Sequence, residues 1–209
     1  DTPRRAYIYL PESYDEEPDR RYPVMYMFDG HNVFFDEDAT FGKSWGMNDY
    51  MERTGKQLII VGVECNHQGN CRLSEYSPVT FENAELGKIR GRGSTTMNWM
   101  VNELKPYIDE HFRTLPDRRN TILAGSSMGG LMALYGATVY NSVFQRAACL
   151  SPSLWVAPGK VMELIARARI RPDTTIYMDY GENEMANHVA SQAVIPSAVY
   201  LLLTKGAVS

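Results

Sequence analysis

Hydrophobic residues form short blocks along the chain, separated by polar stretches, and the blocks have two kinds of spacing. Nearly continuous or alternating apolar runs predict strands, and they occupy 5–10, 23–28, 57–63, 121–124, 146–150 and 174–180. Apolar residues spaced three or four apart predict helices, at 48–53, 94–112, 128–140, 161–168 and 188–205. This alternation predicts a single α/β domain over 1–209, with a mainly parallel sheet flanked by helices.

Two prolines and one long polar stretch modify this outline. Pro106 should kink the helix at 94–112, and Pro196 should mark a kink or a break in the last one. Residues 65–93 are polar and contain glycine, so they predict a long loop. A loop of that length in a compact domain is usually functional or partly disordered.

Several polar and small residues directly follow the predicted strands: Asp29-Gly30, Ser127, Ser151-Pro152 and Gly181-Glu182. In parallel α/β sheets, ligands bind at the carboxyl ends of the strands. We therefore expect these residues to meet at one edge of the sheet and to form the site there.

The most specific of these segments is Gly125-Ser126-Ser127-Met128-Gly129, between a short strand and a helix. A Gly-x-Ser-x-Gly sequence in that context predicts a nucleophile elbow with Ser127 as the nucleophile. Glycines before and after the serine allow the close backbone approach that the turn needs. The alternative is a loop rich in glycine and serine that carries no chemistry.

Overall charge and hydropathy exclude some classes of partner. The net charge is −4 with both signs interspersed, and no basic stripe favours nucleic acid. No apolar run is long enough to cross a bilayer. The acidic, disulfide-poor composition favours the cytoplasm, and a removed leader stays possible.

The three cysteines do not form a disulfide framework. Cys149 lies in an apolar run and is expected to be a small buried hydrophobe. Cys65, His67 and Cys71 form a Cys-x-His-x3-Cys pattern that lacks a fourth ligand and the usual paired spacing of metal sites. We interpret them as ordinary loop thiols and expect no metal or organic cofactor.

Taken in order, the motifs resemble the esterase family of α/β hydrolases, over nearly the whole chain. The family includes feruloyl and acetyl-xylan esterases, enterobactin-type siderophore esterases, S-formylglutathione hydrolases and mycolyltransferases. The matching segments are 22–30, 72–78, 103–109, the elbow, 150–155 and 180–184. The resemblance implies an α/β-hydrolase fold that cleaves small-molecule or carbohydrate-linked carboxylic esters through an acyl-enzyme on Ser127.

Acyl transfer also needs donors for the developing oxyanion. The residue after the nucleophile supplies one, so we expect the backbone amide of Met128 to donate. The resemblance implies a second amide from the turn after the early strand, that of His31, with Gly30 giving this turn its freedom. The side chain of His31 need not be the base.

A carboxylate and then a histidine should follow the serine in chain order. Glu184 occupies the acid position in the family pattern Gly-x-x-Asp/Glu after Gly181, with Glu182 and Asp179 as alternatives. After this carboxylate the sequence contains only His188.

In the family, the catalytic histidine follows one further strand. We therefore expect the last strand, the histidine loop and the closing helix to lie beyond Ser209. The alternative bases are His188, His31 and His67, none of which has the expected position. His111 is expected to be an exposed helix residue.

Trp155, Tyr76 and Arg72 are candidates for the substrate pocket, with Trp45 and Tyr180 as further aromatic candidates. Each is equally explained by packing, and Arg72 by a structural pair with Glu75. Two other functions stay open: an acyltransferase on the same fold, and a carbohydrate- or siderophore-binding domain without catalysis.

Overall fold

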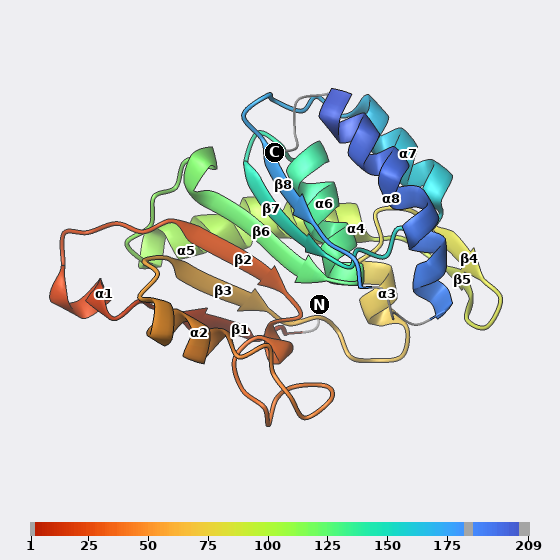
Figure 1. The fold of residues 1–209 in the computed structure, drawn as a ribbon. Helices are drawn as coiled ribbons and strands as arrows, with labels where there is room; N and C mark the ends of the chain where they lie inside the picture. Colours follow the sequence, from red (N-terminus) through yellow and green to blue (C-terminus); the bar gives the residue numbers. More distant parts are fainter. Residues whose placement is uncertain (1–2, 182–185, 205–209) are drawn as a thin grey trace.

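A six-stranded sheet forms the centre of the computed structural model, which describes residues 3–181 and 186–204 (Figure 1). The strand order is β1-β3-β2-β6-β7-β8; β1 is antiparallel to β3 and the other neighbours are parallel. The strands are β1 (Ala6–Tyr9), β2 (Val24–Phe28), β3 (Ile59–Val63), β6 (Thr121–Ser126), β7 (Arg146–Leu150) and β8 (Thr175–Met178). The expected mainly parallel α/β fold is confirmed.

Helices cover both faces of this sheet. The described helices are α1 (Ser13–Glu16), which lies beyond one end of the sheet, α2 (Met47–Thr54), α3 (Cys71–Glu75), α4 (Gly93–Trp99), α5 (Lys105–His111), α6 (Met128–Val139), α7 (Pro158–Arg167) and α8 (Ala186–Thr204). Short 3₁₀ turns lie at Gly30–Asn32 and Arg118–Asn120. In the described ranges, no helix is both long enough and apolar enough to span a bilayer.

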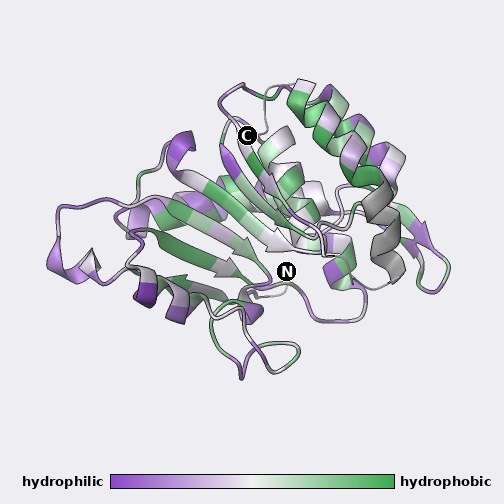
Figure 2. Ribbon diagram, in the orientation of Figure 1, coloured by the Kyte–Doolittle hydropathy of each residue, from purple (hydrophilic) through white to green (hydrophobic). Residues whose placement is uncertain are grey.

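The core divides into a large and a small cluster, one on each face of the sheet. The large cluster joins alternate strand residues, such as Tyr26 and Leu123, to α4 through α8, and α7 and α8 lie side by side (Figure 1). The small cluster joins Met27 and Ile60 to Met51 of α2. Every residue of β3 is buried, as its continuous apolar run predicts, and the central strands are strongly hydrophobic in Figure 2.

The predicted long loop at 65–93 contains regular structure, so this part of the prediction was wrong. It holds α3 and a hairpin of β4 (Phe81–Asn83) and β5 (Gly87–Ile89). Its end is tied back by bonds from the Arg92 amide to the Ser74 carbonyl and from the Gly93 amide to the Ser77 carbonyl, at 2.8 and 2.7 Å. Elements of three to five residues are too short to show a hydrophobic period.

The two prolines behave differently. The helix at 94–112 is interrupted, as predicted, by a π-helical turn at Met100–Leu104 just before Pro106. A wider turn relieves the clash between the proline ring and the carbonyl four residues earlier. α8 continues as one helix through Pro196, so the helix does not break there.

Candidate functional site

Two neighbouring turns form the centre of the carboxyl edge of the sheet. β2 and β6 are paired in parallel from Val24 and Thr121 onward, so the turns that follow them lie next to each other. A Cβ atom at Gly129 would lie 3.2 Å from Oδ2 of Asp29. The first turn contains Asp29 and the second contains Ser127, as the sequence predicts.

Ser127 has a strained backbone. Its φ of 57° and ψ of −118° link the end of β6 directly to the start of α6. Conformations of this kind cost a non-glycine residue about 1–3 kcal/mol and persist only where the surroundings impose them. A sharp, strained strand-to-helix turn is the geometry that a nucleophile elbow requires.

This turn needs glycine at three positions, because at each of them neighbouring atoms lie too close for a side chain. A Cβ atom at Gly125 would lie 2.5 Å from the carbonyl carbon and oxygen of Gly129. At Gly130 it would lie 2.8 Å from the Leu150 carbonyl oxygen, and at Gly129 3.0 Å from Cβ of Phe28. The two turns and the end of β7 are thus packed backbone against backbone.

The segment after β7 also holds Ser127. The Ser127 amide donates to the Leu150 carbonyl at 2.9 Å, and the Ser153 amide donates to the Ser127 carbonyl at 3.0 Å. The two hydroxyl oxygens, of Ser127 and the fully buried Ser153, are 3.1 Å apart. Sequence reasoning did not identify Ser153; the only signal was its place after a predicted strand.

The two backbone amides expected to form the oxyanion hole lie in these two adjacent turns. Within the described residues, neither the amide of Met128 nor that of His31 donates to an acceptor. Met128 is the first residue of the 12-residue helix α6, whose positive dipole end therefore faces the same side. The arrangement is compatible with the expected oxyanion hole, whose role stays a prediction.

The reason for Gly30 differs from the one expected. The positive φ in this turn belongs to Asp29, at φ 58° and ψ 50°, and Gly30 supplies no unusual conformation. A Cβ atom at Gly30 would instead lie 2.4 Å from the carbonyl carbon and oxygen of Gly62. Gly30 is required because the backbone of β3 passes so close.

Asp29 is held by a bidentate ion pair. Its carboxylate accepts bonds from Nε and Nη2 of Arg72 at 2.7 and 2.8 Å, and its side chain is 2% exposed. The expected pair of Arg72 with Glu75 is wrong, because Glu75 pairs with Arg4 and accepts the Asn66 amide at 3.0 Å. About a third of the Arg72 side chain stays exposed, at 32%.

Tyr76 lies beneath the Asp29 turn. It is 2% exposed, its hydroxyl accepts the Asp29 amide at 3.1 Å, and its ring packs edge-on against Phe28. Complete burial raises the pKa of the Tyr76 hydroxyl well above its ordinary value. These contacts make Tyr76 a structural support of the turn rather than the open aromatic surface expected of a substrate pocket.

The other aromatic candidates are placed separately. Trp155 packs edge-on against Phe81 of the hairpin, at 5.8 Å between ring centroids, and its pocket role stays a prediction. Trp45 packs with the small cluster. A cavity of about 520 Å³ is lined by Tyr76 and by side chains of the first residues, α3 and α4, and its lining includes neither Ser127 nor Trp155.

The predicted acid falls largely outside the described residues. Glu184 and Glu182 lie in 182–185, so neither is placed. The alternative, Asp179, follows β8 and accepts the Ser151 amide at 3.0 Å through Oδ1. Asp179 therefore supports the turn after β7, where Ser151 has a positive φ of 42°.

The described histidine side chains make other contacts. The His31 ring is 5% exposed and its Nε2 lies 3.0 Å from Oγ1 of Thr40. His67 packs edge-on against His31, at 4.4 Å between centroids, and His111 stacks on Tyr107 on α5. Among these side chains, none hydrogen-bonds to Ser127, and the side chain of His188 lies outside the described set.

Two cysteines are buried, as expected of Cys149. Burial raises the pKa of Cys65 to about 12 and also raises that of Cys149. Both thiols are therefore protonated near neutral pH, and the thiolate is the nucleophilic form. These two thiols are therefore poor candidates for nucleophiles.

The family model described as "Putative esterase" matches residues 1–199. The chain is 30% identical over 140 residues to Esterase Rv1288 of Mycobacterium tuberculosis, covering 67% of this chain and 27% of that protein.

Two solved structures share the fold. An IroE-like serine hydrolase from Shewanella oneidensis matches with a TM-score of 0.73 and 21% identity, covering 95% of this chain and 65% of that one. The enterobactin esterase FES from Shigella flexneri matches with a TM-score of 0.62 and 17% identity, covering 97% and 48%. The chain thus spans less than two thirds of these proteins.

Proposed function

The chain belongs to the esterase family whose model it matches, and from that premise we propose that it hydrolyses carboxylic esters through an acyl-enzyme on Ser127. The observation that carries this proposal is the strained backbone of Ser127, at φ 57° and ψ −118°, where β6 meets α6. Strained backbone conformations cluster at active sites. Ser127 lies at the sheet edge, in the turn next to the one that carries the His31 amide.

In the proposed reaction, Oγ of Ser127 attacks the ester carbonyl carbon. The carbonyl oxygen gains the negative charge and accepts bonds from the amides of Met128 and His31. Each such donor contributes about 2.7–4 kcal/mol to the transition state in the best-studied case. The alcohol leaves with a proton, and water then attacks the acyl-enzyme to regenerate the serine.

The serine proton requires a base, because a serine hydroxyl is a weak nucleophile at its own pKa. We assign this role to a histidine oriented by Glu184, both outside the described side chains. Ser153 contributes a second function: its hydroxyl, 3.1 Å from that of Ser127, fixes the side chain before the substrate enters. A fixed nucleophile loses less entropy on reaching the transition state.

The proposed substrates are small esters of the sugar, feruloyl or siderophore type. The name of the enterobactin esterase that shares the fold supports the siderophore type. Arg72 supports an anionic or polyhydroxylated acyl group, because its positively charged side chain is about a third exposed beside the Asp29 turn. Hydrolysis of a panel that contains all three ester types would rank them by kcat/KM.

Labelling by a fluorophosphonate probe tests the nucleophile on the full-length protein. Ser127→Ala should abolish labelling and lower ester hydrolysis by about 10⁴-fold or more. Ser126→Ala is the matched control, since it removes the neighbouring hydroxyl and should still label. Equal labelling of Ser127→Ala and the wild type would contradict the proposal.

A further inference from the structure

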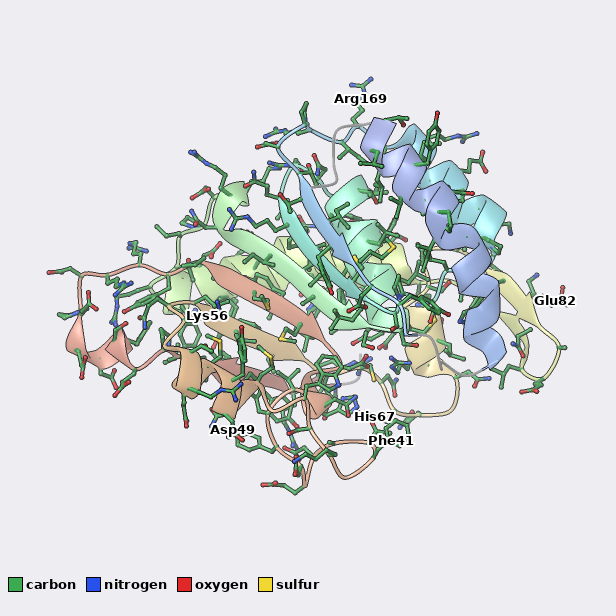
Figure 3. The ribbon with its side chains drawn as sticks, viewed as in Figure 1. Phe41, Asp49, Lys56, His67, Glu82 and Arg169 are labelled. Carbon is green, nitrogen blue, oxygen red and sulfur yellow. The ribbon has the colours of Figure 1, made fainter. Side chains whose placement is uncertain are left out.

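Three side chains of types that can bind metals, those of His31, Cys65 and His67, lie close together beside the Asp29 turn. His31 follows β2, and Cys65 and His67 follow β3 (His67 is labelled in Figure 3). Because β2 and β3 are paired in parallel, with Phe28 opposite Val63, their trailing loops are adjacent. One donor atom from each of the three side chains lies within 4.8 Å of the other two.

One nitrogen of the buried His31 ring is unused. Nε2 of His31 lies 3.0 Å from the Thr40 hydroxyl, whereas Nδ1 is buried with no hydrogen-bond partner in the described part of the chain. The whole residue is 5% exposed. A buried polar atom without a partner costs about 1–3 kcal/mol, and a bound ligand would remove that cost.

The contacts of His67 also leave its Nδ1 atom available to an ion. Nε2 of His67 lies 3.7 Å from a carboxylate oxygen of Glu64, and Nδ1 lies 4.0 Å from Sγ of Cys65. Histidines that bind metals generally use one ring nitrogen for the ion and give the other to a carboxylate or another oxygen. Thr40 and Glu64 are placed to take that second role for the two rings.

We propose that His31 Nδ1, Cys65 Sγ and His67 Nδ1 form a binding site for one Zn²⁺ ion. Two imidazoles and a thiolate are a donor set that zinc prefers, and a water molecule would complete a tetrahedron. The thiol proton passes to solvent as the zinc–sulfur bond forms. Zinc–ligand bonds of about 2.0–2.3 Å require the donors to close to about 3.5 Å.

The three side chains differ in exposure, which leaves one of them room to move toward an ion. His31 and Cys65 are buried, whereas the His67 side chain is 53% exposed and lies on a loop. His67 can therefore move onto an ion held by the other two. Cys71, which the sequence pattern suggested as a ligand, is the first residue of α3 and does not belong to the cluster.

Zinc at this site would join the turn after β2 to the loop after β3. The same turn carries the His31 amide, so zinc should change kcat for ester hydrolysis. That consequence rests on the proposed function, whereas zinc binding does not. If zinc binds but leaves kcat unchanged, the zinc site stands and only its effect on catalysis is refuted.

The binding test uses Zn²⁺ titration by calorimetry and Co²⁺ as a spectroscopic substitute, on the full-length protein. Wild type should bind one ion per chain and show a cobalt–thiolate charge-transfer band. Cys65→Ser should remove that band, and His67→Ala should weaken zinc binding by at least about tenfold. Cys71→Ser is the matched control and should bind as the wild type does.

His67→Ala guards against a folding artefact, because this exposed side chain can be removed without opening the core. Circular dichroism of Cys65→Ser shows whether that variant is folded. Absence of zinc binding by the wild type at micromolar concentrations would overturn the proposal. So would unchanged binding by His67→Ala, or a loss in Cys71→Ser equal to that in Cys65→Ser.

Discussion

Two adjacent turns, at Asp29 and at Ser127, show two ways of holding a non-glycine residue at positive φ. Both follow parallel strands of the same sheet, and both lead into a helical turn. Asp29 is held through its side chain, by Arg72 and by burial. Ser127 is held through its backbone, by glycines that bring neighbouring segments within contact.

The difference determines what each turn can offer to chemistry. The Asp29 carboxylate is engaged with Arg72, so Asp29 itself offers no side-chain group, although its turn still carries the amide and the ring of His31. Backbone packing fixes the turn at Ser127, and the Ser127 hydroxyl contacts that of Ser153 at 3.1 Å. Because one turn depends on a side-chain ion pair and the other on backbone packing, each should fail in its own way.

The largest effect is expected from Gly125→Ala, which adds a side-chain atom to the tightly packed turn at Ser127. Its new Cβ atom would lie 2.5 Å from two backbone atoms of Gly129, and neither can rotate away. We expect a loss of about 3 kcal/mol or more in the free energy of unfolding, at the upper end for overpacking. Urea denaturation measures it.

Gly159→Ala is the control for this change. Gly159 lies in the first turn of α7, and a Cβ atom added there would have no neighbour within 4 Å. Alanine there should be neutral or stabilise the protein by up to about 1 kcal/mol. Similar losses in the two variants would show that the close approach at Gly125 does not limit stability.

The next largest effect is expected from Asp29→Asn, which breaks the ion pair with Arg72. Asparagine tolerates the left-handed conformation, but its neutral amide cannot accept charged hydrogen bonds from both Nε and Nη2 of Arg72. We expect a loss of about 2–4 kcal/mol, below that for a fully buried pair because Arg72 is partly exposed. Glu163→Gln breaks the exposed pair with Arg167 and should change the unfolding midpoint little.

A smaller effect is expected from Tyr76→Phe, which removes the acceptor of the Asp29 amide. A buried amide left without a partner costs about 1–2 kcal/mol. Tyr26→Phe is the matched control: the Tyr26 hydroxyl is buried and has no partner in the described residues. Removing this hydroxyl should be neutral or stabilising. Denaturation curves should therefore show a loss of stability for Tyr76→Phe and either no change or a gain for Tyr26→Phe.

The sequence predicts local features of the site better than distant ones. The glycine spacing around Ser127 predicts the strained turn because its steric demands involve neighbours in the chain. The ion pair of Asp29 with Arg72 joins two segments far apart in sequence, and no local pattern signals it. Ser153 has the same difficulty, since it reaches Ser127 only when β7 pairs with β6.

The same distinction applies to the residues of the proposed zinc site and to the fold. Cys65 and His67 attract attention by their spacing, but the third member, His31, comes from another loop. Strands with continuous apolar runs were predicted within a few residues of their bounds, because burial on both faces dictates their composition. α3 and the β4–β5 hairpin were missed because they are too short to show a period.

The smallest expected effect is a gain in stability from Ser127→Gly, measured against Ser127→Ala. Glycine adopts φ 57° and ψ −118° without the strain that costs other residues about 1–3 kcal/mol, but loses about 0.5–1 kcal/mol more chain entropy. The free energy of unfolding of Ser127→Gly should therefore exceed that of Ser127→Ala by about 1 kcal/mol, and neither variant should hydrolyse esters. If Ser127→Gly were instead less stable than Ser127→Ala by the entropy cost of about 0.5–1 kcal/mol, the turn would hold Ser127 without strain, and packing alone would then distinguish it from the Asp29 turn.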